Sequence, residues 1–359
     1  MAKLAEAFKA FTKIITTYQK GQLLKVNFAI TYKCNSRCQM CNIWKRYIKS
    51  PEKAEEELEL EEIRQTFERF GKLVWVSLTG GEPFLRDDIV DIVQSAKDNC
   101  KVNMVNITTN GFKSKLVESR VRDIAEVNVP LTFVNISLDG HAELHDYMRG
   151  TKGAYENAIR TLKLLHMLCS KYNNLLIGFE YTTTPFNAGN LAQLVYKLKE
   201  VGCDWLVENL TITTYHQGNL YDNVDLNLSQ QFGYDSLKFK MLKDINEALN
   251  LTHAKSPLAL IRRAYLKYAR KYVRDGSAPL RCRALRNSLF LDPYGNVFPC
   301  VILGHEIGNL RNCQYEVYKL LNSKYALKAK HEVEICKKCW TPCEAYPSIM
   351  TQLTSLIKA

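Results

Sequence analysis

The sequence lacks any run of 18 consecutive apolar residues, and this absence excludes a membrane-spanning helix of ordinary length. It also lacks a signal-peptide pattern, since Lys3, Glu6 and Lys9 interrupt the apolar residues near the N-terminus. Without a secretory signal, 12 cysteines among 359 residues predict metal ligation in a reducing compartment and not a disulfide framework. We therefore expect a cytoplasmic protein.

Histidine is scarce too, and none precedes His141. Cys34, Cys38 and Cys41 form a C-x3-C-x2-C loop directly after an apolar run, 26–30, that is typical of a buried strand. Three thiols cannot complete a zinc site or an ordinary iron–sulfur cluster, each of which takes four protein ligands. The loop therefore predicts an open coordination position, where a metal can do chemistry. The alternative is a zinc knuckle with a fourth ligand from elsewhere in the chain.

Apolar strand-like runs alternate with helical patterns from residue 26 to about residue 210. The expected strands are 26–31, 73–79, 102–109, 131–138, 175–183 and 205–211, and the expected helices between them are 59–70, 87–98, 113–126, 154–171 and 189–201. Such alternation predicts an α/β protein with a parallel sheet and helices outside it. Six units fit either a partial (β/α) barrel or a strongly curved open sheet.

Polar or glycine-containing turns follow consecutive predicted strands, at 79–83 (TGGEP), 108–111 (TTNG) and 135–140 (NISLDG). The carboxyl ends of parallel strands share one rim, where ligands bind, so we expect these turns to lie beside the cysteine loop. Gly80 and Gly81 allow a close approach of the backbone to a ligand. Glu82 offers a carboxylate suited to a cationic amine, and Pro83 stiffens the turn.

Two further turns supply polar side chains. Ser137 and Asp139 are two residues apart on a predicted strand, so both should face the same side, where they suit ribose hydroxyls. Asn110 is either a rim residue near a ligand or a left-handed turn residue before glycine.

On its cysteine loop, the chain resembles the radical S-adenosylmethionine (radical SAM) enzymes. In that family the loop holds a 4Fe–4S cluster on three irons, and S-adenosylmethionine chelates the fourth. The GGEP stretch and the S-x-D pattern resemble the family's cofactor-binding strands, which implies cofactor contacts from Gly80, Gly81, Glu82, Pro83, Asn110, Ser137 and Asp139. The resemblance also favours a partial (β/α)6 TIM-like barrel.

The stretch with His145, Asp146 and Arg149 resembles one in the peptide-modifying branch of the family. Arg149 could bind the cofactor carboxylate as a charge-assisted pair, or form a structural ion pair with Asp146.

A second group of cysteines lies near the C-terminal end. Cys282 and Cys300 flank a predicted β-hairpin over 290–298, and Cys336, Cys339 and Cys343 follow. Four such ligands can complete a metal site, and zinc is the alternative on ligand chemistry alone. The C-x12-G-x4-C pattern followed by C-x2-C resembles the SPASM/Twitch extension of the family. This resemblance implies one auxiliary 4Fe–4S cluster, with Cys343 able to replace Cys336 or Cys339.

Two segments fall outside the resemblance. Residues 2–20 predict an amphipathic helix that closes one end of the domain, or alternatively lies on lipid. Residues 258–274 predict a basic helix, either with a solvated face or as a docking surface for an anionic substrate or lipid headgroups. The net charge of +12 fits an anionic partner, but no RNA-binding motif is present and we expect no nucleic acid.

The expected organisation is therefore an N-terminal helix (1–22), a barrel (23–212), a helical, basic connection (213–280), a small cysteine-rich auxiliary-cluster domain (281–345) and a C-terminal helix (346–359). Candidate catalytic residues lie near the ends of the fifth and sixth predicted strands: Glu180, Tyr181, Glu208 and Tyr215.

The resemblance implies an enzyme. Its reduced cluster would cleave S-adenosylmethionine to methionine and a 5′-deoxyadenosyl radical, which abstracts hydrogen from an unactivated C–H bond of the substrate. A one-electron reductant such as ferredoxin or flavodoxin is implied as a partner. The basic helix and the N-terminal segment favour an anionic small-molecule or lipid-like substrate, with a peripheral membrane contact. The SPASM-like tail favours peptide or protein maturation instead. A third hypothesis is a non-enzymatic iron–sulfur scaffold or electron carrier.

Overall fold

The computed structural model describes residues 23–214, 221, 234–253 and 256–352. The predicted helix over 2–20 and Tyr215 lie outside the described residues, as does the end of the chain from residue 353. No helix within the described ranges has the length and apolar character to cross a bilayer.

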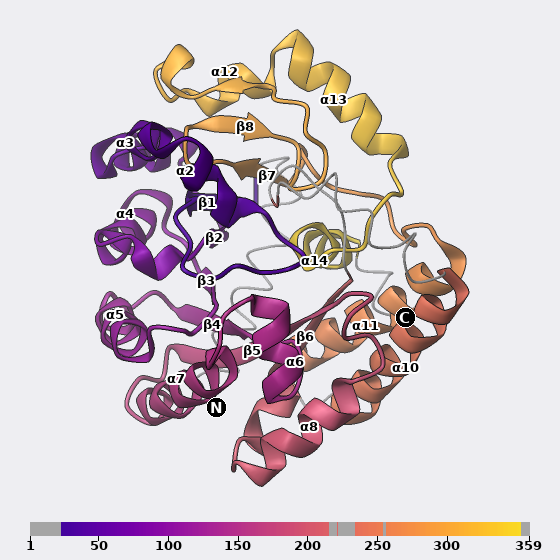
Figure 1. Cartoon of the computed structure of the whole chain (residues 1–359). Helices are drawn as coiled ribbons and strands as arrows, with labels where there is room; N and C mark the ends of the chain where they lie inside the picture. Colours follow the sequence, from indigo (N-terminus) through magenta and orange to yellow (C-terminus); the bar gives the residue numbers. More distant parts are fainter. Residues whose placement is uncertain (1–22, 215–220, 222–233, 254–255, 353–359) are drawn as a thin grey trace.

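Six parallel strands form the framework of the fold (Figure 1). They are β1 (Lys25–Thr31), β2 (Trp75–Gly80), β3 (Met104–Thr109), β4 (Leu131–Ser137), β5 (Leu175–Thr183) and β6 (Leu210–Thr214). The strands pair in sequence order from β1 to β6, and β6 forms the far edge of the sheet. The sheet is therefore an incomplete barrel, which confirms the predicted fold class.

The sixth strand begins later than predicted. The prediction of a strand over 205–211 is wrong for most of its length, because Asp204–Asn209 form a 3₁₀ helix, η4, and β6 starts only at Leu210. Leu206 and Val207 of η4 are buried. A short buried apolar run of this kind has no periodicity that separates a strand from a helical turn.

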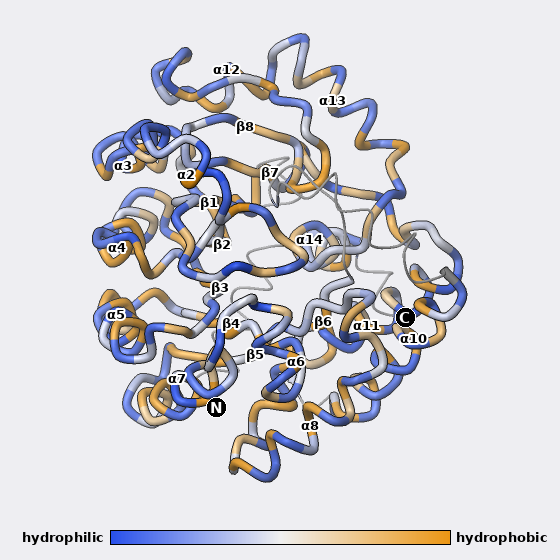
Figure 2. Tube along the Cα trace, in the orientation of Figure 1, coloured by the Kyte–Doolittle hydropathy of each residue, from blue (hydrophilic) through white to orange (hydrophobic). Residues whose placement is uncertain are grey.

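Helices on the outside connect the strands. They are α3 (Leu60–Phe70), α4 (Ile89–Cys100), α5 (Ser114–Glu126), α6 (Ala142–Arg149), α7 (Ala154–Cys169) and α8 (Leu191–Glu200), with shorter turns at η1 (Ile43–Lys45), α2 (Arg46–Lys49), η2 (Pro51–Glu56) and η3 (Pro83–Leu85). Figure 2 shows hydrophobic and hydrophilic residues mixed along each of these helices, and many of their hydrophobic residues belong to the main core. In α3, for example, a capping box of Glu59 and Glu62 starts the helix, and Ile63 and Phe67 are fully buried.

The two faces of each strand have different roles. On β1, Val26, Phe28 and Ile30 belong to the main core. The alternate residues of each strand point into the barrel, because successive side chains of a strand face opposite sides. The main core is therefore built outside the sheet, and the inside holds the side chains that line a cavity, apolar where the strands begin and mostly polar farther along.

The chain after β6 completes the wall. It contains α10 (Tyr234–Leu251), α11 (Pro257–Asp275), β7 (Ser288–Leu291), β8 (Asn296–Phe298), β9 (Gly308–Asn309), η6 (Arg311–Cys313), α12 (Val317–Leu321), α13 (Lys324–Ile335) and α14 (Pro342–Thr351). Strands β7 and β8 pair antiparallel, which confirms the predicted hairpin, and β7 pairs in parallel with β1. One continuous nine-stranded sheet results.

Helix α14 occupies the open side of the barrel, between β7 and β6 (Figure 1). Its Tyr346 ring stacks on Tyr265 of α11, with ring centroids 4.9 Å apart. Trp340, just before α14, donates through its indole N–H to the Tyr265 carbonyl at 3.1 Å. The predicted C-terminal helix over 346–359 thus starts four residues early, at Pro342, a residue suited to a helix N-terminus.

The basic helix α11 is only partly solvated. Arg262 is buried and donates to the Glu208 carbonyl, and Arg263 donates to the carbonyls of Leu249 (2.7 Å) and Thr252 (2.9 Å) at the end of α10. These two arginines are packing residues, so the prediction of a solvated face is wrong for them. It holds for exposed Arg270, Lys271 and Arg274, which lie farther along α11.

Candidate active site

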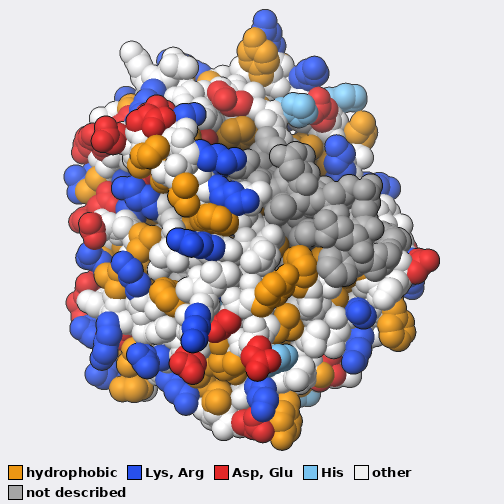
Figure 3. All heavy atoms as spheres, viewed as in Figure 1, with side chains coloured by type: hydrophobic (Ala, Val, Ile, Leu, Met, Phe, Trp, Pro, Cys, Tyr) orange, Lys and Arg blue, Asp and Glu red, His pale blue; other side chains and the backbone are white. Residues whose placement is uncertain are grey.

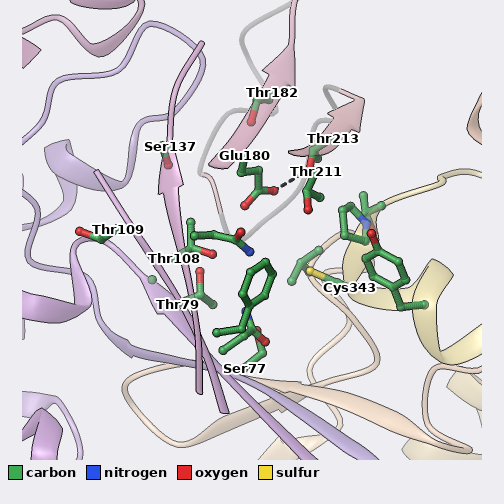
Figure 4. A pocket seen from close by; sticks show the side chains of 18 of the residues that line it. Ser77, Thr79, Thr108, Thr109, Ser137, Glu180, Thr182, Thr211, Thr213 and Cys343 are labelled. Atoms are coloured by element: carbon green, nitrogen blue, oxygen red, sulfur yellow. Dashed lines mark hydrogen bonds between the residues drawn. The ribbon is translucent and has the colours of Figure 1, made fainter. Parts of the chain in front are cut away.

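A cavity of about 300 Å³ occupies the inside of the barrel (Figure 4). Strand pairing places its lining residues in layers. Lys25, Trp75, Met104 and Leu131 pair at the bottom, where the strands begin. Farther along the strands, most lining groups carry hydroxyls: Ser77, Thr79, Thr108, Thr109, Ser137, Thr182, Thr211, Thr213 and Thr214. The cavity thus has a largely apolar floor with one cation and a polar upper wall.

The cysteine loop forms the upper edge of this cavity, and Cys34, Cys38 and Cys41 all line it. The backbone N–H groups of Arg37 and Gln39 donate to carbonyls at the end of α6, at 3.0 and 2.9 Å. These contacts hold the loop over the barrel. Burial first, and then the neighbouring Cys38 thiol, raises the pKa of the Cys34 thiol to about 12.

This donor set fits a polynuclear iron cluster. Within the described part of the chain, no three His, Cys, Asp or Glu side chains converge as ligands of a single metal ion would. A cuboidal cluster takes its thiolates at separate irons, so it accepts a wider spacing. In such a cluster the three thiolates of the loop would leave one iron without a ligand from the loop.

Gly80 and Gly81 let the end of β2 lie against the cysteine loop. The Gly81 and Glu82 N–H groups donate to the carbonyls of Thr31 and Lys33, both at 2.8 Å. A Cβ at Gly80 would lie 2.2 Å from the Thr31 carbonyl oxygen, and one at Gly81 would lie 2.2 Å from that of Lys33. The glycines are therefore required by the chain's own packing at the cavity edge, before any ligand is considered.

Replacement of Gly81 by alanine should lower the free energy of unfolding by about 3 kcal/mol, because backbone atoms of Lys33 cannot yield to the new methyl group. Urea denaturation measures the loss. Gly71→Ala is the control: it has a left-handed φ of 64° but nothing within 4 Å of its Cβ, and should lose only about 1 to 2 kcal/mol. Equal losses in both variants would contradict the steric argument.

The Glu82 side chain lies beneath the rim. Its carboxylate accepts from the Thr109 hydroxyl (2.8 Å) and the Asn110 N–H (2.7 Å), and burial raises its pKa to about 7. It therefore links β2 to the turn after β3, while Pro83 opens η3 behind it. Gly80 and Gly81 line the cavity, whereas the Glu82 carboxylate is held by Thr109 and Asn110, so the expected contact of Glu82 with a cationic amine stays a prediction.

Asn110 lies on the cavity wall. Its amide Nδ2 donates to Asn35 Oδ1 in the cysteine loop at 2.8 Å, and its Oδ1 accepts from the Phe112 N–H. The left-handed residue of this turn is Gly111, with φ of 70°. Asn110 is thus a rim residue that ties β3 to the loop.

Ser137 and Asp139 separate, contrary to expectation. Ser137 lines the cavity, but β4 ends there and strand alternation does not extend to Asp139. Asp139 is fully buried behind the wall, where it pairs with Arg149 (2.5 Å) and accepts from the Thr182 N–H (2.9 Å). Arg149 lines the cavity and contacts Cys38 Sγ at 3.7 Å. Its ion-pair partner is Asp139 and not Asp146, which instead caps the start of α7 through the N–H groups of 153 and 155.

Of the candidate catalytic residues, only Glu180 is placed in the cavity. It accepts from the Thr213 hydroxyl at 2.5 Å, and burial raises the pKa of its carboxyl (Figure 4). Tyr181 points to the helix side and donates to the Asn187 carbonyl, as expected for the next residue of a strand. Glu208 is exposed on η4, and Tyr215 lies outside the described residues.

The C-terminal cysteines divide into two groups. Cys282 and Cys300 pack in one small cluster. Cys336 contributes to the raised pKa of Cys282, and Cys339 contributes to the raised pKa of Cys300. The pKa of Cys339 is in turn raised by Cys282 and Cys336, after the larger effect of burial. Cys343 packs elsewhere, in the cluster that also contains Cys41, and it lines the cavity. The structure therefore brings four of the five candidate ligands together and separates the fifth.

Sequence reasoning missed Lys25. It lies one residue before the predicted first strand, is only 2% exposed, and places its ammonium 3.7 Å from the Trp75 ring centroid. Its Nζ donates to the Cys343 carbonyl at 3.1 Å, and burial lowers its pKa. A lysine at the start of this strand is a usable signal, because it shares one face of the strand with Asn27, whereas Val26, Phe28 and Ile30 on the other face are apolar.

Comparisons with known protein families match the two parts of the chain that carry the cysteine groups. The sequence profile of the Radical SAM superfamily matches residues 28–188, and that of an iron-sulfur cluster-binding domain, SPASM, matches residues 282–340. Pre-heme d1 synthase of Dinoroseobacter shibae is 29% identical over 177 residues, 49% of this chain and 40% of that protein. The antilisterial bacteriocin subtilosin biosynthesis protein AlbA of Bacillus subtilis is 21% identical over 332 residues, 90% and 66% of the two chains. This chain thus spans less than two thirds of either relative.

Solved structures share the fold. Native anSMEcpe with bound AdoMet and Cp18Cys peptide has a TM-score of 0.60 at 15% identity, covering 93% of this chain and 98% of that one. Streptococcus suis SuiB bound to S-adenosylmethionine has a TM-score of 0.53 at 15% identity, covering 89% and 69%.

Proposed function

The chain belongs to the radical SAM superfamily and carries its SPASM iron–sulfur domain, and on this premise we propose that it is an enzyme acting on a C–H bond of a substrate held in the barrel cavity. When bound at the three-cysteine loop, a reduced 4Fe–4S cluster and S-adenosylmethionine supply a 5′-deoxyadenosyl radical for hydrogen abstraction. The observation that carries the proposal is the position of Cys34, Cys38 and Cys41 on the edge of a buried cavity.

The chain's own residues provide the cofactor site. Cys34, Cys38 and Cys41 would hold the cluster, and the polar rim around Asn110 and Ser137 would receive S-adenosylmethionine. Cys282, Cys300, Cys336 and Cys339 would hold an auxiliary 4Fe–4S cluster in the SPASM domain. The barrel wall around the cavity would limit the access of water, and this would protect reactive species formed inside it.

We propose an anionic organic molecule as the substrate. Lys25 is the cation at the cavity floor, among Trp75, Met104 and Leu131. A polar group placed among apolar ones fixes the orientation of a bound ligand. Glu180, higher on the wall, provides a carboxyl that can exchange a proton with the substrate.

A peptide is the second candidate substrate. It is favoured by the similarity to the subtilosin biosynthesis protein over 90% of this chain. A peptide substrate would bind in the same cavity as an anionic organic molecule, so the two candidate substrates differ in their chemical class and not in their binding site.

The reductant is proposed to be an acidic one-electron carrier such as ferredoxin or flavodoxin. Figure 3 shows Lys and Arg side chains gathered with hydrophobic ones over α2 and the nearby loop. Lys33, Arg37 and Lys49 are exposed there, close in sequence to Cys34 and Cys38. Complementary charge steers such encounters and makes them depend on ionic strength.

The decisive test is release of 5′-deoxyadenosine from S-adenosylmethionine by the reconstituted, reduced protein. Release at a rate well above a protein-free control supports the enzyme. A protein that holds its clusters but releases none is a scaffold or an electron carrier.

A pelleting experiment separates the substrate classes. If the substrate is an anionic lipid, the chain should sediment with phosphatidylserine vesicles. Deletion of residues 1–20 should abolish sedimentation, since the sequence of this segment is basic and predicts an amphipathic helix. Phosphatidylcholine vesicles are the control. No sedimentation with either vesicle would leave a water-soluble anion or a peptide as the substrate.

A further inference from the structure

Cys343 is the cysteine that the structure separates from the auxiliary group. It is the second residue of α14 and lines the cavity (Figure 4). It packs with Cys41 against one apolar cluster, which contains Ala29, Tyr32, Ile43, Phe290 and Val301. Cys282 and Cys300 pack against a different cluster. Helix α14 therefore presents a thiol to the same cavity that the cysteine loop borders.

Two buried polar groups show that this cavity is built to hold a polar molecule. Asn135 is only 7% exposed, lines the cavity, and has an Oδ1 without a hydrogen-bond partner among the described residues. Lys25 is 2% exposed and also lines the cavity, with one hydrogen bond to the Cys343 carbonyl. Unpaired buried polar atoms cost free energy unless a ligand or water satisfies them. The thiol therefore belongs to a ligand site and is not an isolated cysteine.

Resting on the proposed function, we propose that Cys343 is the hydrogen-atom donor of the cavity and returns a hydrogen atom to a carbon radical on the substrate. A thiol S–H bond is weaker than an aliphatic C–H bond, so the transfer is favourable. The S–H bond breaks homolytically. The hydrogen atom, with one electron, forms the new C–H bond, and the other electron stays on sulfur as a thiyl radical. One electron from the ferredoxin- or flavodoxin-type reductant and one proton from solvent restore the thiol.

This assignment changes the expected outcome at the substrate. A carbon radical quenched by Cys343 gains one hydrogen that had exchanged with solvent, and it is not oxidised by losing an electron. The auxiliary centre then needs only Cys282, Cys300, Cys336 and Cys339.

The test is abortive turnover in D2O, with S-adenosylmethionine and reductant but no added substrate or thiol. A carbon radical formed in the cavity then takes its hydrogen from the nearest donor, and a thiol in D2O carries deuterium. The 5′-deoxyadenosine released by the wild-type chain should therefore carry deuterium, and mass spectrometry measures the deuterated fraction. Cys343→Ala and Cys343→Ser should each lower the deuterated fraction about tenfold, since a hydroxyl O–H is too strong to replace the thiol.

Iron and sulfide analysis of the same holoproteins provides the second readout. Cys343→Ala should keep the wild-type iron content, whereas Cys339→Ala should lose the auxiliary cluster. Cys313→Ala is the matched control. The Cys313 Sγ contacts the Leu310 carbonyl, and this variant should match the wild type in both measurements.

An unchanged deuterated fraction in Cys343→Ala would overturn the donor role. Loss of the auxiliary iron in that variant would also overturn it, because Cys343 would then be a ligand. If even the wild type releases no 5′-deoxyadenosine, the proposed function itself fails, and the donor role fails with it.

Discussion

The triple variant Cys34→Ala/Cys38→Ala/Cys41→Ala should contain about four irons per chain where the wild type contains about eight, because only the auxiliary 4Fe–4S cluster remains. Its release of 5′-deoxyadenosine should fall to the protein-free background. The physical reason is that the loop supplies every protein ligand at the cavity edge. No other cysteine in the described part of the barrel lines the cavity together with them, apart from Cys343 on α14.

Iron and sulfide analysis with chromatography of the nucleoside products measures both effects. Cys169→Ala on α7 is the matched control, since Cys169 lies outside both cysteine groups, and it should retain the full iron content and the full release. A triple variant that keeps all its iron would show that the loop does not hold a cluster. One that loses all its iron would show that the two centres assemble together.

Arg149→Met should lower the free energy of unfolding by about 3 to 5 kcal/mol, because it leaves the Asp139 carboxylate buried without its cation. In the wild type, burial already raises the pKa of Asp139, and Arg149 opposes that rise. Without Arg149 the folded-state pKa of Asp139 rises further above its value in the unfolded chain. A group of this kind contributes stability at low pH and loses it as the pH rises through its folded pKa. The deficit of the variant should therefore be smaller at pH 5 than at pH 8.

Urea denaturation at the two pH values, under anaerobic conditions, measures this deficit. Arg160→Met is the control, because Arg160 is exposed on α7, and its effect should stay within about 0.5 kcal/mol at both pH values. A deficit in Arg149→Met that grows on acidification would contradict the role assigned to the ion pair. Loss of iron in this variant is a further readout, since Arg149 also contacts Cys38.

The fold followed from the sequence because local signals agreed with the global arrangement. Alternating strand and helix patterns, and turns at the strand ends, predicted five of the six barrel strands to within a few residues. The sixth strand was predicted too early in the chain, because the short apolar run with Leu206 and Val207 is buried by tertiary packing and has no periodicity that separates a strand from a helical turn. The β-hairpin was predictable from its turn residues, but its pairing with β1 was not, since a contact between Lys25 and Ser288 has no local signal.

The site was predicted less completely, for reasons that particular residues show. Cysteine and glycine spacing located the loop and the close approach of Gly81. Side-chain direction beyond a strand end could not be inferred, so Asp139 was expected beside Ser137 although β4 ends between them. Tyr181 was proposed from its position near a strand end, without allowing for the alternation that turns it away from Glu180. The separation of Cys343 from Cys339 depends on where α14 starts, which only the folded chain reveals.

The pairing of β7 with β1, and the placement of α14 on the barrel's open flank, mean that the SPASM segment is not an exchangeable module. A truncation after residue 280 would leave β1 paired with β2 alone and turn its other side into an exposed edge, and exposed edges invite association with other chains. Grafting the corresponding segment of a relative onto this barrel would have to reproduce the register of Lys25 with Ser288 and of Phe28 with Leu291. Recombination in this family is therefore expected to succeed at crossover points outside the region from β7 to α14, and to give aggregated chimaeras within it.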